Sequence, residues 1–372
     1  MQRIGIATFF DDNFGTCLQA YALQQTIKKL GYEPEIIRYY RGERNVQTES
    51  RWKKLFRYSP KTIYKYITQR GMIERKRATF KRFRSQDMIF SNDAYFRDSH
   101  LDVLKNKYDA YVCGSDMIWS EDFQDDWAFL YLTFADKCKS IAYAPSFGKN
   151  YLSDSNIERC KPYIKGIGYL SCREQAGVDL IKRNFNLDAT HVIDPTLLMA
   201  SEEWNKAIGT DKRLIEKKYN LVYCFLGTKN GREKIFKQLK AQKDEELVFL
   251  SGADGDYKKY MYQGNTGPFE FAQMYRDAEF VVTDTFHGML FAIIFRKPFV
   301  VLAKEPFGVS ADRLKYTLES LGLEDRYIQY DAVIDEKYLT LDYIPVIEKL
   351  EKMQDVSVNY LKESLAKATD NG

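Results

Sequence analysis

The chain has 372 residues, of which 45% are hydrophobic, 15% aromatic and 29% charged, and its formal net charge is +4. This composition excludes an intrinsically disordered protein, and the length exceeds the about 250 to 300 residues that one hydrophobic core serves, so we expect two domains. The apolar runs are far shorter than the about 20 residues of a transmembrane helix, and residues 1–10 do not resemble a signal peptide, so we expect a cytoplasmic protein.

The first elements in chain order form a βαβ unit. Ile4, Ile6 and Thr8 open a short strand, residues 11–16 form a loop, and apolar residues at helical spacing then mark a helix that ends at Gly31. A second strand follows at residues 35–40. This order predicts two parallel neighbours in one sheet.

Residues 51–84 come next and concentrate the positive charge. They hold 13 Lys and Arg residues against Glu74 alone, a local charge of +12 that leaves the rest of the chain at −8. Apolar residues interleave with these charges at near-helical spacing, interrupted by Pro60 and Gly71, which predicts basic amphipathic helices. Two interpretations stay open: a helical excursion packed on its own domain, or a surface for anionic lipid head groups or another polyanion, which would give a peripheral contact with the membrane. We expect no nucleic-acid partner, because the remaining chain is acidic.

The rest of the chain alternates short strands with helices. The N-terminal half continues with predicted strands at 110–113, 140–144, 168–172 and 191–193, and a helix at 175–185. The pattern then restarts with strands at 221–226, 246–250, 280–283 and 299–302, separated by helices at 230–242, 269–277 and 288–295. Short apolar strands that end in polar or Gly-containing loops indicate parallel sheets.

The predicted fold class is therefore α/β, with two Rossmann-like domains that face each other across a cleft. We place the first domain at residues 1–205, with a basic helical insertion at about 45–100, and the second at 206–340. A helical segment at 341–372 is expected to pack back on the first domain. Ligands of open α/β sheets bind beyond the carboxyl ends of the strands, so the loops after the strands hold the candidate site residues.

The loop after the first strand contains Asn13-Phe14-Gly15-Thr16 at a predicted helix N-terminus, where backbone N–H groups attract an anion. Neither G-x-G-x-x-G nor G-x-x-x-x-G-K-[ST] occurs in the chain, so dinucleotide and P-loop binding lack support. The loop after residue 113 contains Gly114-Ser115-Asp116, where Gly permits close approach of the backbone and Asp116 supplies a carboxylate. A plain Asx turn is the equal alternative there.

Two further loops carry stronger functional groups. Arg173 follows a predicted strand, where it either forms a salt bridge or acts as a forked donor to a carboxylate or phosphate ligand. Thr285-Phe286-His287-Gly288 joins an apolar strand to an apolar helix, and so places His287 at a helix N-terminus, which favours an anion. Gly288 is expected to leave room for a ligand, and we expect His287 to contact that ligand rather than to serve only as a cap.

Other chemistry-bearing patterns are weak. Asp254-Gly255-Asp256 is similar to the metal-binding D-x-D of some glycosyltransferases, but its glycines favour a surface turn. His100 and His191 lack neighbouring metal ligands in the sequence, so we expect both to be structural. The motifs of serine hydrolases and zinc proteases are absent from the sequence. The six cysteines lack a C-x-x-C pair and zinc-finger spacing, so we expect free thiols and no metal site; Cys17, at a predicted helix N-terminus, is most simply a packed thiol.

As a set, these loops resemble the motifs of the polysaccharide pyruvyl transferase family. The motifs occur in family order across roughly residues 4–325, and although each is short, the combination is specific. The stretches are NFGTCLQAYAL at 13–23, VCGSD at 112–116 with Trp119, AYAPSFG at 142–148, SCRE at 171–174, IDPTLL at 193–198, DTFHG at 284–288 and DRL at 312–314.

The resemblance implies a GT-B-like fold and transfer of pyruvate from phosphoenolpyruvate to two hydroxyls of a sugar in a cell-envelope or capsular polysaccharide precursor, giving a pyruvate ketal without a cofactor or metal. By the same resemblance, His287 is a general acid or a hydrogen-bond donor to the phosphate, and Asp116 or Asp194 takes the hydroxyl proton. Arg173, Arg313 and Asn13 would bind the donor. The other substrate-binding residues of these motifs are Gly15, Gly114, Ser115, Ser146, Thr285 and Gly288.

One position departs from the family pattern, because many members carry an Arg two residues before the His, where this chain has Thr285. The phosphate must then draw on another cation, and the candidates are Arg173, Arg313, Lys229 and Lys304. Two other functions fit the same fold: a GT-B glycosyltransferase that uses a nucleotide sugar, and a non-catalytic sugar-binding protein. The expected partners are phosphoenolpyruvate and a glycan acceptor. A lipid-linked precursor at the inner face of the membrane would be one such acceptor. The sequence is also compatible with an oligomer.

Overall fold

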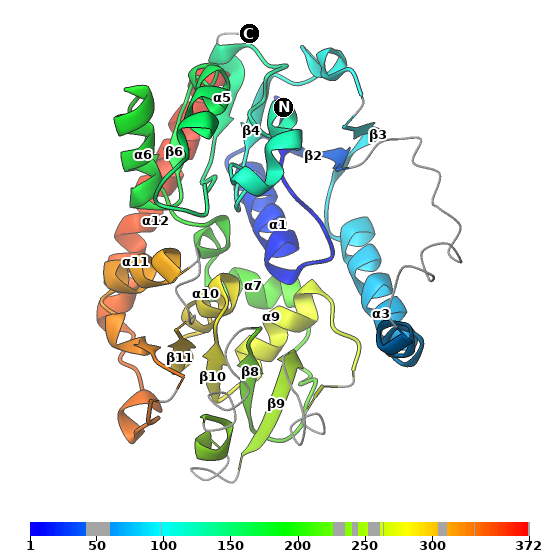
Figure 1. The fold of residues 1–372 in the computed structure, drawn as a ribbon, viewed down its shortest axis with the longest axis vertical. Helices are drawn as coiled ribbons and strands as arrows, with labels where there is room; N and C mark the ends of the chain where they lie inside the picture. Colours follow the sequence, from blue (N-terminus) through cyan, green and yellow to red (C-terminus); the bar gives the residue numbers. More distant parts are fainter. Residues whose placement is uncertain are drawn as a thin grey trace.

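The computed structural model describes residues 1–41, 60–97, 99–225, 235–239, 245–251, 261–262, 264–303, 311–330 and 332–370. Two α/β halves are stacked along the longest axis of the molecule, with the N-terminal half at the top of Figure 1 and the C-terminal half at the bottom. Each half is built around a five-stranded parallel sheet. This architecture confirms the predicted α/β class.

The N-terminal sheet has the strand order β3-β2-β1-β4-β5, with every neighbouring pair parallel. This is the doubly wound order of dinucleotide-binding folds, and the direction of winding reverses between β1 and β4. Its strands are β1 (Arg3–Ala7), β2 (Glu33–Tyr40), β3 (Phe90–Phe96), β4 (Ala110–Cys113) and β5 (Ser140–Ala142). Its helices are α1 (Phe14–Lys29), α3 (Pro60–Gln86), α4 (Trp127–Leu130), α5 (Asp154–Lys165) and α6 (Gln175–Phe185).

The C-terminal sheet has the order β12-β11-β10-β8-β9, also fully parallel, and its winding reverses between β8 and β10. Its strands are β8 (Tyr219–Tyr223), β9 (Glu246–Ser251), β10 (Phe280–Thr283), β11 (Phe299–Leu302) and β12 (Tyr327–Ile328). The helices that follow the N-terminal half are α7 (Ser201–Ile208), α9 (Pro268–Asp277), α10 (Phe286–Ile294), α11 (Ala311–Leu321) and α12 (Ile344–Asp370). The 3-10 turns are η1 (Leu101–Leu104), η2 (Glu121–Asp126), η3 (Lys137–Lys139), η4 (Pro195–Leu198), η6 (Glu324–Arg326) and η7 (Glu336–Tyr338).

Several details differ from the predicted elements. The strands β6 (Ser171–Cys172) and β7 (Thr190–His191) pair with each other in a two-stranded sheet, which a single bridge between Ile141 and Tyr169 joins to β5. Edge strand β3 lies inside the stretch that we expected to be a helical insertion. Helix α10 begins two residues before the predicted start, so His287 lies in its first turn. The predicted helix at 230–242 lies largely outside the described residues.

One apolar core runs through both halves of the molecule. Phe14 of α1 lies between two other rings, 5.2 Å from that of Phe80 in α3 and 4.7 Å from that of Phe271 in α9, both stacked. Trp204 of α7 and Phe291 of α10 belong to the same cluster. The two halves therefore share a hydrophobic interface at their centre, and the aromatic residues supply much of its buried area.

Helix α3 is the described part of the basic segment, and its C-terminal portion packs within the protein. Phe80 and Phe83 are buried, and Arg82 forms an ion pair with Glu270 of α9. Arg84 pairs with Asp12 at a distance of 2.8 Å. This packing agrees with a helical excursion that docks on its own protein; residues 51–59 lie outside the described residues. Among the helices that are described, none combines the length and the hydropathy needed to cross a membrane.

Helix α12 returns the chain from the C-terminal half to the N-terminal half, and the C-terminus lies at the far end of that half (Figure 1). The Tyr360 hydroxyl donates to the carbonyl oxygen of Ala142 at 3.0 Å, and the Ser357 hydroxyl accepts from the N–H of Ile193 at 3.0 Å. Leu361 and Leu365 are fully buried in the shared core. The last helix thus joins the two halves by packing.

We expect Leu361→Ala to lower the free energy of unfolding by about 2 to 5 kcal/mol, because it leaves a cavity where the helix meets the core. The measurement is urea denaturation followed by circular dichroism. Val356→Ala in the same helix is the matched control, since Val356 is 52% exposed, and its effect should stay within about 0.5 kcal/mol. Equal effects of the two variants would contradict the docking of α12.

Candidate active site

A cavity of about 510 Å³ lies where the reversal points of the two sheets meet. From the N-terminal half it is lined by residues that follow β1 and β4, and from the C-terminal half by residues that follow β8 and β10. Open α/β sheets bind ligands at such points, and here two of them face one space. The predicted site residues that line the cavity are Asn13, Gly15, Asp116, Thr285, His287 and Arg313.

His287 lies in the first turn of α10, directly against the first turn of α1. A Cβ atom on Gly15 would lie 2.0 Å from Nδ1 of His287, far inside van der Waals contact. The imidazole therefore occupies the space that glycine leaves open, and its position depends on the absence of a side chain at residue 15. Its Nε2 atom lies 3.6 Å from Oδ2 of Asp194, and its side chain is 14% exposed. The contact brings a residue of the C-terminal half onto the N-terminal half.

Asp194 follows β7 and is completely buried among donors. Its Oδ2 accepts from Nη1 of Arg173 at 2.9 Å, and its Oδ1 accepts from the N–H of Thr196 at 2.9 Å and from the Thr196 hydroxyl at 2.8 Å. Burial alone would raise the pKa of Asp194, but His287, Arg173 and the Thr196 N–H hold this pKa well below its ordinary value. Asp194 is thus a fixed negative charge at neutral pH.

Asp116 is the carboxylate at the wall of the cavity. It adopts a left-handed backbone conformation, with φ of 74°, and accepts a hydrogen bond of 3.1 Å from the hydroxyl of Thr16. Burial raises the pKa of Asp116, but the nearby charges of Arg173, His287 and Arg313 lower it more, so that this pKa lies below its ordinary value. Asp116 is therefore ionised at neutral pH and faces the space where a substrate would lie.

Three buried donor atoms at this site lack a hydrogen-bond partner within the described part of the chain: Nη2 of Arg173, Nε2 of His287 and Nε of Arg313. The guanidinium carbons of Arg173 and Arg313 lie 4.5 Å and 5.1 Å from the centre of the Phe286 ring. Burial and the charge of Arg173 lower the pKa of Arg313. Buried donors without partners cost about 1 to 3 kcal/mol each, a cost that an anion beside them would remove. Nε2 of His287 already has the carboxylate of Asp194 at 3.6 Å.

Arg173 and Asp194 lie behind the cavity wall rather than on it. Besides Asp194, Arg173 pairs with Glu174 at 3.0 Å and lies 3.7 Å from Asp116. Of the two interpretations of Arg173, the salt bridge is the one that the structure shows, and Nη2 alone stays available to a ligand. Of the two candidate bases, only Asp116 reaches the cavity.

Four other predicted binding residues serve the protein's own packing. A Cβ atom on Gly114 would lie 1.9 Å from the carbonyl oxygen of Tyr143, and one on Gly288 would lie 2.4 Å from two Thr hydroxyls. The space beside Gly288 is therefore filled by protein, which corrects the expectation that it admits a ligand. Ser115 donates to the carbonyl of Ala144 at 2.9 Å, and Ser146 accepts from the N–H of Gly148 at 3.0 Å. Both serines are fully buried.

Two of the residues that we expected to bind a ligand, Asn13 and Thr285, cap helices with their side chains. Asn13 caps α1 by accepting from the N–H of Thr16 at 3.2 Å, and Thr285 caps α10 by accepting from the N–H of Gly288 at 3.1 Å. Thr16 is the site residue that sequence reasoning missed, since its role depends on Asp116, which is remote in the sequence. The prediction that Cys17 is a packed thiol is confirmed, because its side chain is fully buried and burial raises its pKa to about 12. Lys229, Lys304 and residues 254–256 lie outside the described residues.

The two facing α/β halves form a fold of the GT-B class. The chain is similar to the UDP-GlcNAc 2-epimerase from Methanocaldococcus jannaschii, with 13% identity, a TM-score of 0.52 and coverage of 95% of this chain and 92% of that chain. It is also similar to a UDP-N-acetylglucosamine 2-epimerase, with 9% identity, a TM-score of 0.55 and coverage of 98% and 95%. At such low identity these similarities concern the fold alone.

The family is shown by sequence. The family model described as polysaccharide pyruvyl transferase matches residues 13–305, which is most of the chain and includes both halves of the cavity. The protein belongs to the polysaccharide pyruvyl transferase family, as the motifs of its strand-end loops predicted. No curated protein matches the chain at a comparable level of significance.

We expect Asp194→Asn to lower the free energy of unfolding at pH 7 by about 3 to 5 kcal/mol, because it removes the fully buried carboxylate that pairs with Nη1 of Arg173 and leaves that part of the guanidinium charge uncompensated. The pKa of Asp194 is lowered by folding, so its charged form stabilises the native state above the unfolded pKa of about 3.9, and this contribution disappears as the pH falls. The difference between wild type and variant, measured by urea denaturation, should therefore narrow below about pH 5.

The matched control for this prediction is Asp188→Asn, which removes an exposed carboxylate whose side chain is 92% accessible and pairs with Lys182. Its effect should stay within about 0.5 kcal/mol and should change little with pH. A difference between wild type and Asp194→Asn that stays constant from pH 7 to pH 3 would contradict the stabilising charge that we assign to Asp194.

Proposed function

We propose that this protein transfers the pyruvyl group of phosphoenolpyruvate to two hydroxyls of a sugar, forming a cyclic ketal and releasing phosphate. The observation that supports the proposal most directly is the set of unpartnered buried donors on Arg173, His287 and Arg313, beside the ionised Asp116. Phosphoenolpyruvate carries a carboxylate and a phosphate, which require several donors in one place. The family match and the GT-B fold agree with a sugar acceptor.

Each step of the reaction can be assigned to a group at the cavity. His287 delivers a proton to the methylene carbon of phosphoenolpyruvate, which makes C2 electrophilic. An acceptor hydroxyl attacks C2 and passes its proton to Asp116, the carboxylate that faces the cavity. The bond between C2 and the phosphate oxygen then breaks, and phosphate leaves with the electron pair and the proton held by Asp116. The second hydroxyl closes the ring at C2 and passes its proton to the deprotonated His287.

The anionic donor would be held by the two arginines. Arg313 lines the cavity and takes the place of the Arg that is missing two residues before His287, and Nη2 of Arg173 adds a second donor from behind Phe286. Asp194 keeps Arg173 and His287 in position without reaching the cavity. These residues supply acid, base and anion binding, so we propose that the reaction needs neither a cofactor nor a metal.

We expect the purified protein to release phosphate from phosphoenolpyruvate only when a suitable glycan is present, and the glycan to gain the mass of one pyruvate less one water. His287→Gln should slow this reaction by about 10² to 10⁴, the usual contribution of a general acid. His100→Gln is the matched control, because His100 is exposed and lies outside the cavity. Assays combine phosphate release with mass spectrometry of a panel of envelope glycans.

The melting temperature of the wild-type protein should rise when phosphoenolpyruvate is added, because a ligand at a concentration of 100 times its dissociation constant adds about 2.7 kcal/mol of stability. A rise with nucleotide sugars and none with phosphoenolpyruvate would contradict pyruvyl transfer and favour a glycosyltransferase. Near-normal activity of a folded His287→Gln protein would remove His287 from the mechanism.

We expect Gly15→Ala to lower the rate of pyruvyl transfer by about 10² or more, because its methyl group displaces the imidazole of His287 and misplaced catalytic groups lose about this factor. The free energy of unfolding should fall by no more than about 1 to 3 kcal/mol, the usual cost of overpacking, which the higher helix propensity of Ala partly offsets. Gly71→Ala in α3 is the control, because its Cβ would make only an ordinary contact of 3.6 Å. Equal rates for both variants would contradict the close fit of His287 on Gly15.

A further inference from the structure

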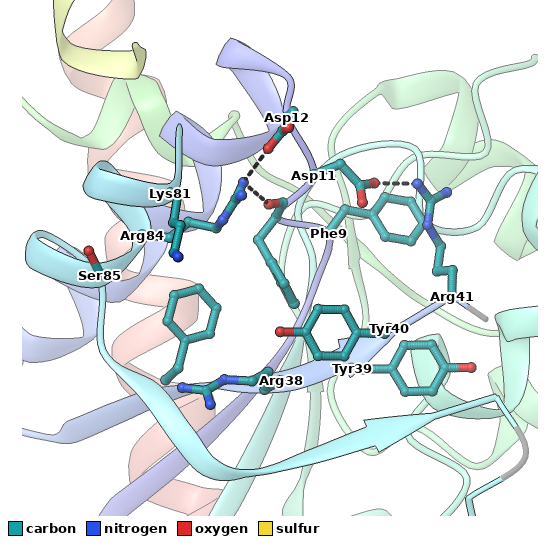
Figure 2. A pocket seen from close by; sticks show the side chains of 12 residues that line it. Phe9, Asp11, Asp12, Arg38, Tyr39, Tyr40, Arg41, Lys81, Arg84 and Ser85 are labelled. Atoms are coloured by element: carbon teal, nitrogen blue, oxygen red, sulfur yellow. Dashed lines mark hydrogen bonds and ion pairs between the residues drawn. The ribbon is translucent and has the colours of Figure 1, made fainter. Parts of the chain in front are cut away.

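A second cavity, of about 580 Å³, lies beside the first in the N-terminal half. Figure 2 shows it between the end of β2, which contributes Arg38 and Tyr40, and helix α3, which contributes Lys81 and Arg84. Its size falls within the range of about 300 to 1,000 Å³ that is typical of small-molecule sites. None of the residues assigned to pyruvyl transfer above lines it.

The charge of this cavity favours an anion. Four cationic side chains line it against two carboxylates, which gives a formal charge of +2. Both carboxylates are already paired, Asp11 with Arg41 and Asp12 with Arg84. Arg38 and Lys81 have no carboxylate within ion-pair distance in the described ranges, and Figure 2 shows them on different walls, one from a strand and one from a helix. An anion between these walls would pair with both.

Aromatic residues form the other part of the lining. Tyr40 is 44% exposed, although it is a large ring at the end of a strand. Its ring lies 5.9 Å from that of Phe10, which in turn lies 5.0 Å from that of Phe90. An exposed tyrosine offers an apolar face and a polar hydroxyl to one ligand, which is the combination that a sugar ring also presents.

The two cavities share one wall. Phe9, Asp11 and Arg41 line both of them, and the guanidinium carbon of Arg41 lies 4.5 Å from the ring centre of Phe9. The Asp11–Arg41 ion pair therefore separates the cationic cavity from the space that contains His287 and Asp116. A ligand that extends over this pair would contact both cavities.

We propose that the cavity between β2 and α3 binds the phosphate-bearing end of the acceptor, a sugar phosphate or sugar diphosphate whose terminal sugar reaches His287 and Asp116. The placement of the terminal sugar beside His287 and Asp116 rests on the proposed pyruvyl transfer, whereas the binding of phosphate does not. Arg38 and Lys81 bind the phosphate, and Tyr40 contacts the sugar attached to it. We assign phosphoenolpyruvate to the other cavity, because His287 and Asp116, the acid and base of the proposed reaction, line that cavity and not this one.

The test measures binding by calorimetry in the absence of phosphoenolpyruvate, so that its outcome does not depend on catalysis. The probes are inorganic pyrophosphate, a set of hexose 1-phosphates with their neutral parent sugars, and a polyprenyl-linked sugar diphosphate in detergent. We expect the phosphorylated probes to bind more tightly than the neutral sugars. The variant Arg38→Gln/Lys81→Gln should weaken pyrophosphate at least about tenfold, since a charged hydrogen bond contributes about 1.5 to 3 kcal/mol.

Two controls keep the result specific. Lys352→Gln/Lys362→Gln removes the same charge from exposed positions of α12 and should leave pyrophosphate affinity unchanged. Tyr40→Ala should weaken the hexose 1-phosphates and leave pyrophosphate unchanged. Pyrophosphate binding that the cavity variant does not alter, equal binding of neutral and phosphorylated sugars, or displacement of pyrophosphate by phosphoenolpyruvate at a single site would each overturn the proposal.

Comparison of the phosphorylated probes also shows whether the phosphate belongs to a lipid-linked precursor or to a soluble sugar phosphate. If the polyprenyl-linked sugar binds more tightly than the hexose 1-phosphate, and the cavity variant weakens both, the acceptor is a lipid-linked precursor whose phosphate occupies the cavity. Equal affinity with the same loss in the variant assigns the site to a soluble sugar phosphate. Failure of pyruvyl transfer with intact, variant-sensitive phosphate binding would overturn the proposed reaction while supporting the second cavity as a phosphate site.

Discussion

The buried carboxylate of Asp194 is the interaction on which the active site depends. It accepts from Arg173 at 2.9 Å and lies 3.6 Å from the imidazole of His287, which comes from the other half of the protein. A buried ion pair is weak evidence for stability, because the desolvation of both charges offsets much of their attraction. The role of Asp194 is instead to position other groups, because its fixed negative charge determines where the guanidinium of Arg173 and the imidazole of His287 can lie, and these two groups come from different halves.

The arrangement follows from the way both sheets are wound. Each parallel sheet has a point at which the order of strands reverses, and both points open onto the same cavity. The N-termini of α1 and α10 meet there, and only a glycine at residue 15 allows the imidazole to approach so closely. The groups to which we assign acid, base and anion-binding roles thus come from segments that are 197 positions apart at most, from Asp116 to Arg313, and are held by rigid elements.

Much of this could be predicted from sequence, because the signals are local. Apolar runs that end in polar loops predicted β4, β10, β11 and α6 with their observed bounds. Strand β3 was missed because its sequence, FSNDAYF, is interrupted by the polar run Ser91-Asn92-Asp93 and lies at the edge of the sheet. Whether Arg173 faces a ligand or a carboxylate could not be predicted, since the answer depends on Asp194 and Asp116, whose approach is a property of the folded chain. The hydrogen bond from Thr16 to Asp116 was out of reach for the same reason.

The stacking of Phe14 between Phe80 and Phe271 has a consequence for how substrates enter. A hinge opening of the two halves would pull these rings apart and expose them to water, at a cost of about 1.5 to 3 kcal/mol for each large apolar side chain. Helix α12 would also have to leave one half. Ligands therefore have to enter and leave through the mouths of the cavities and the loops around them, and not through a separation of the two halves.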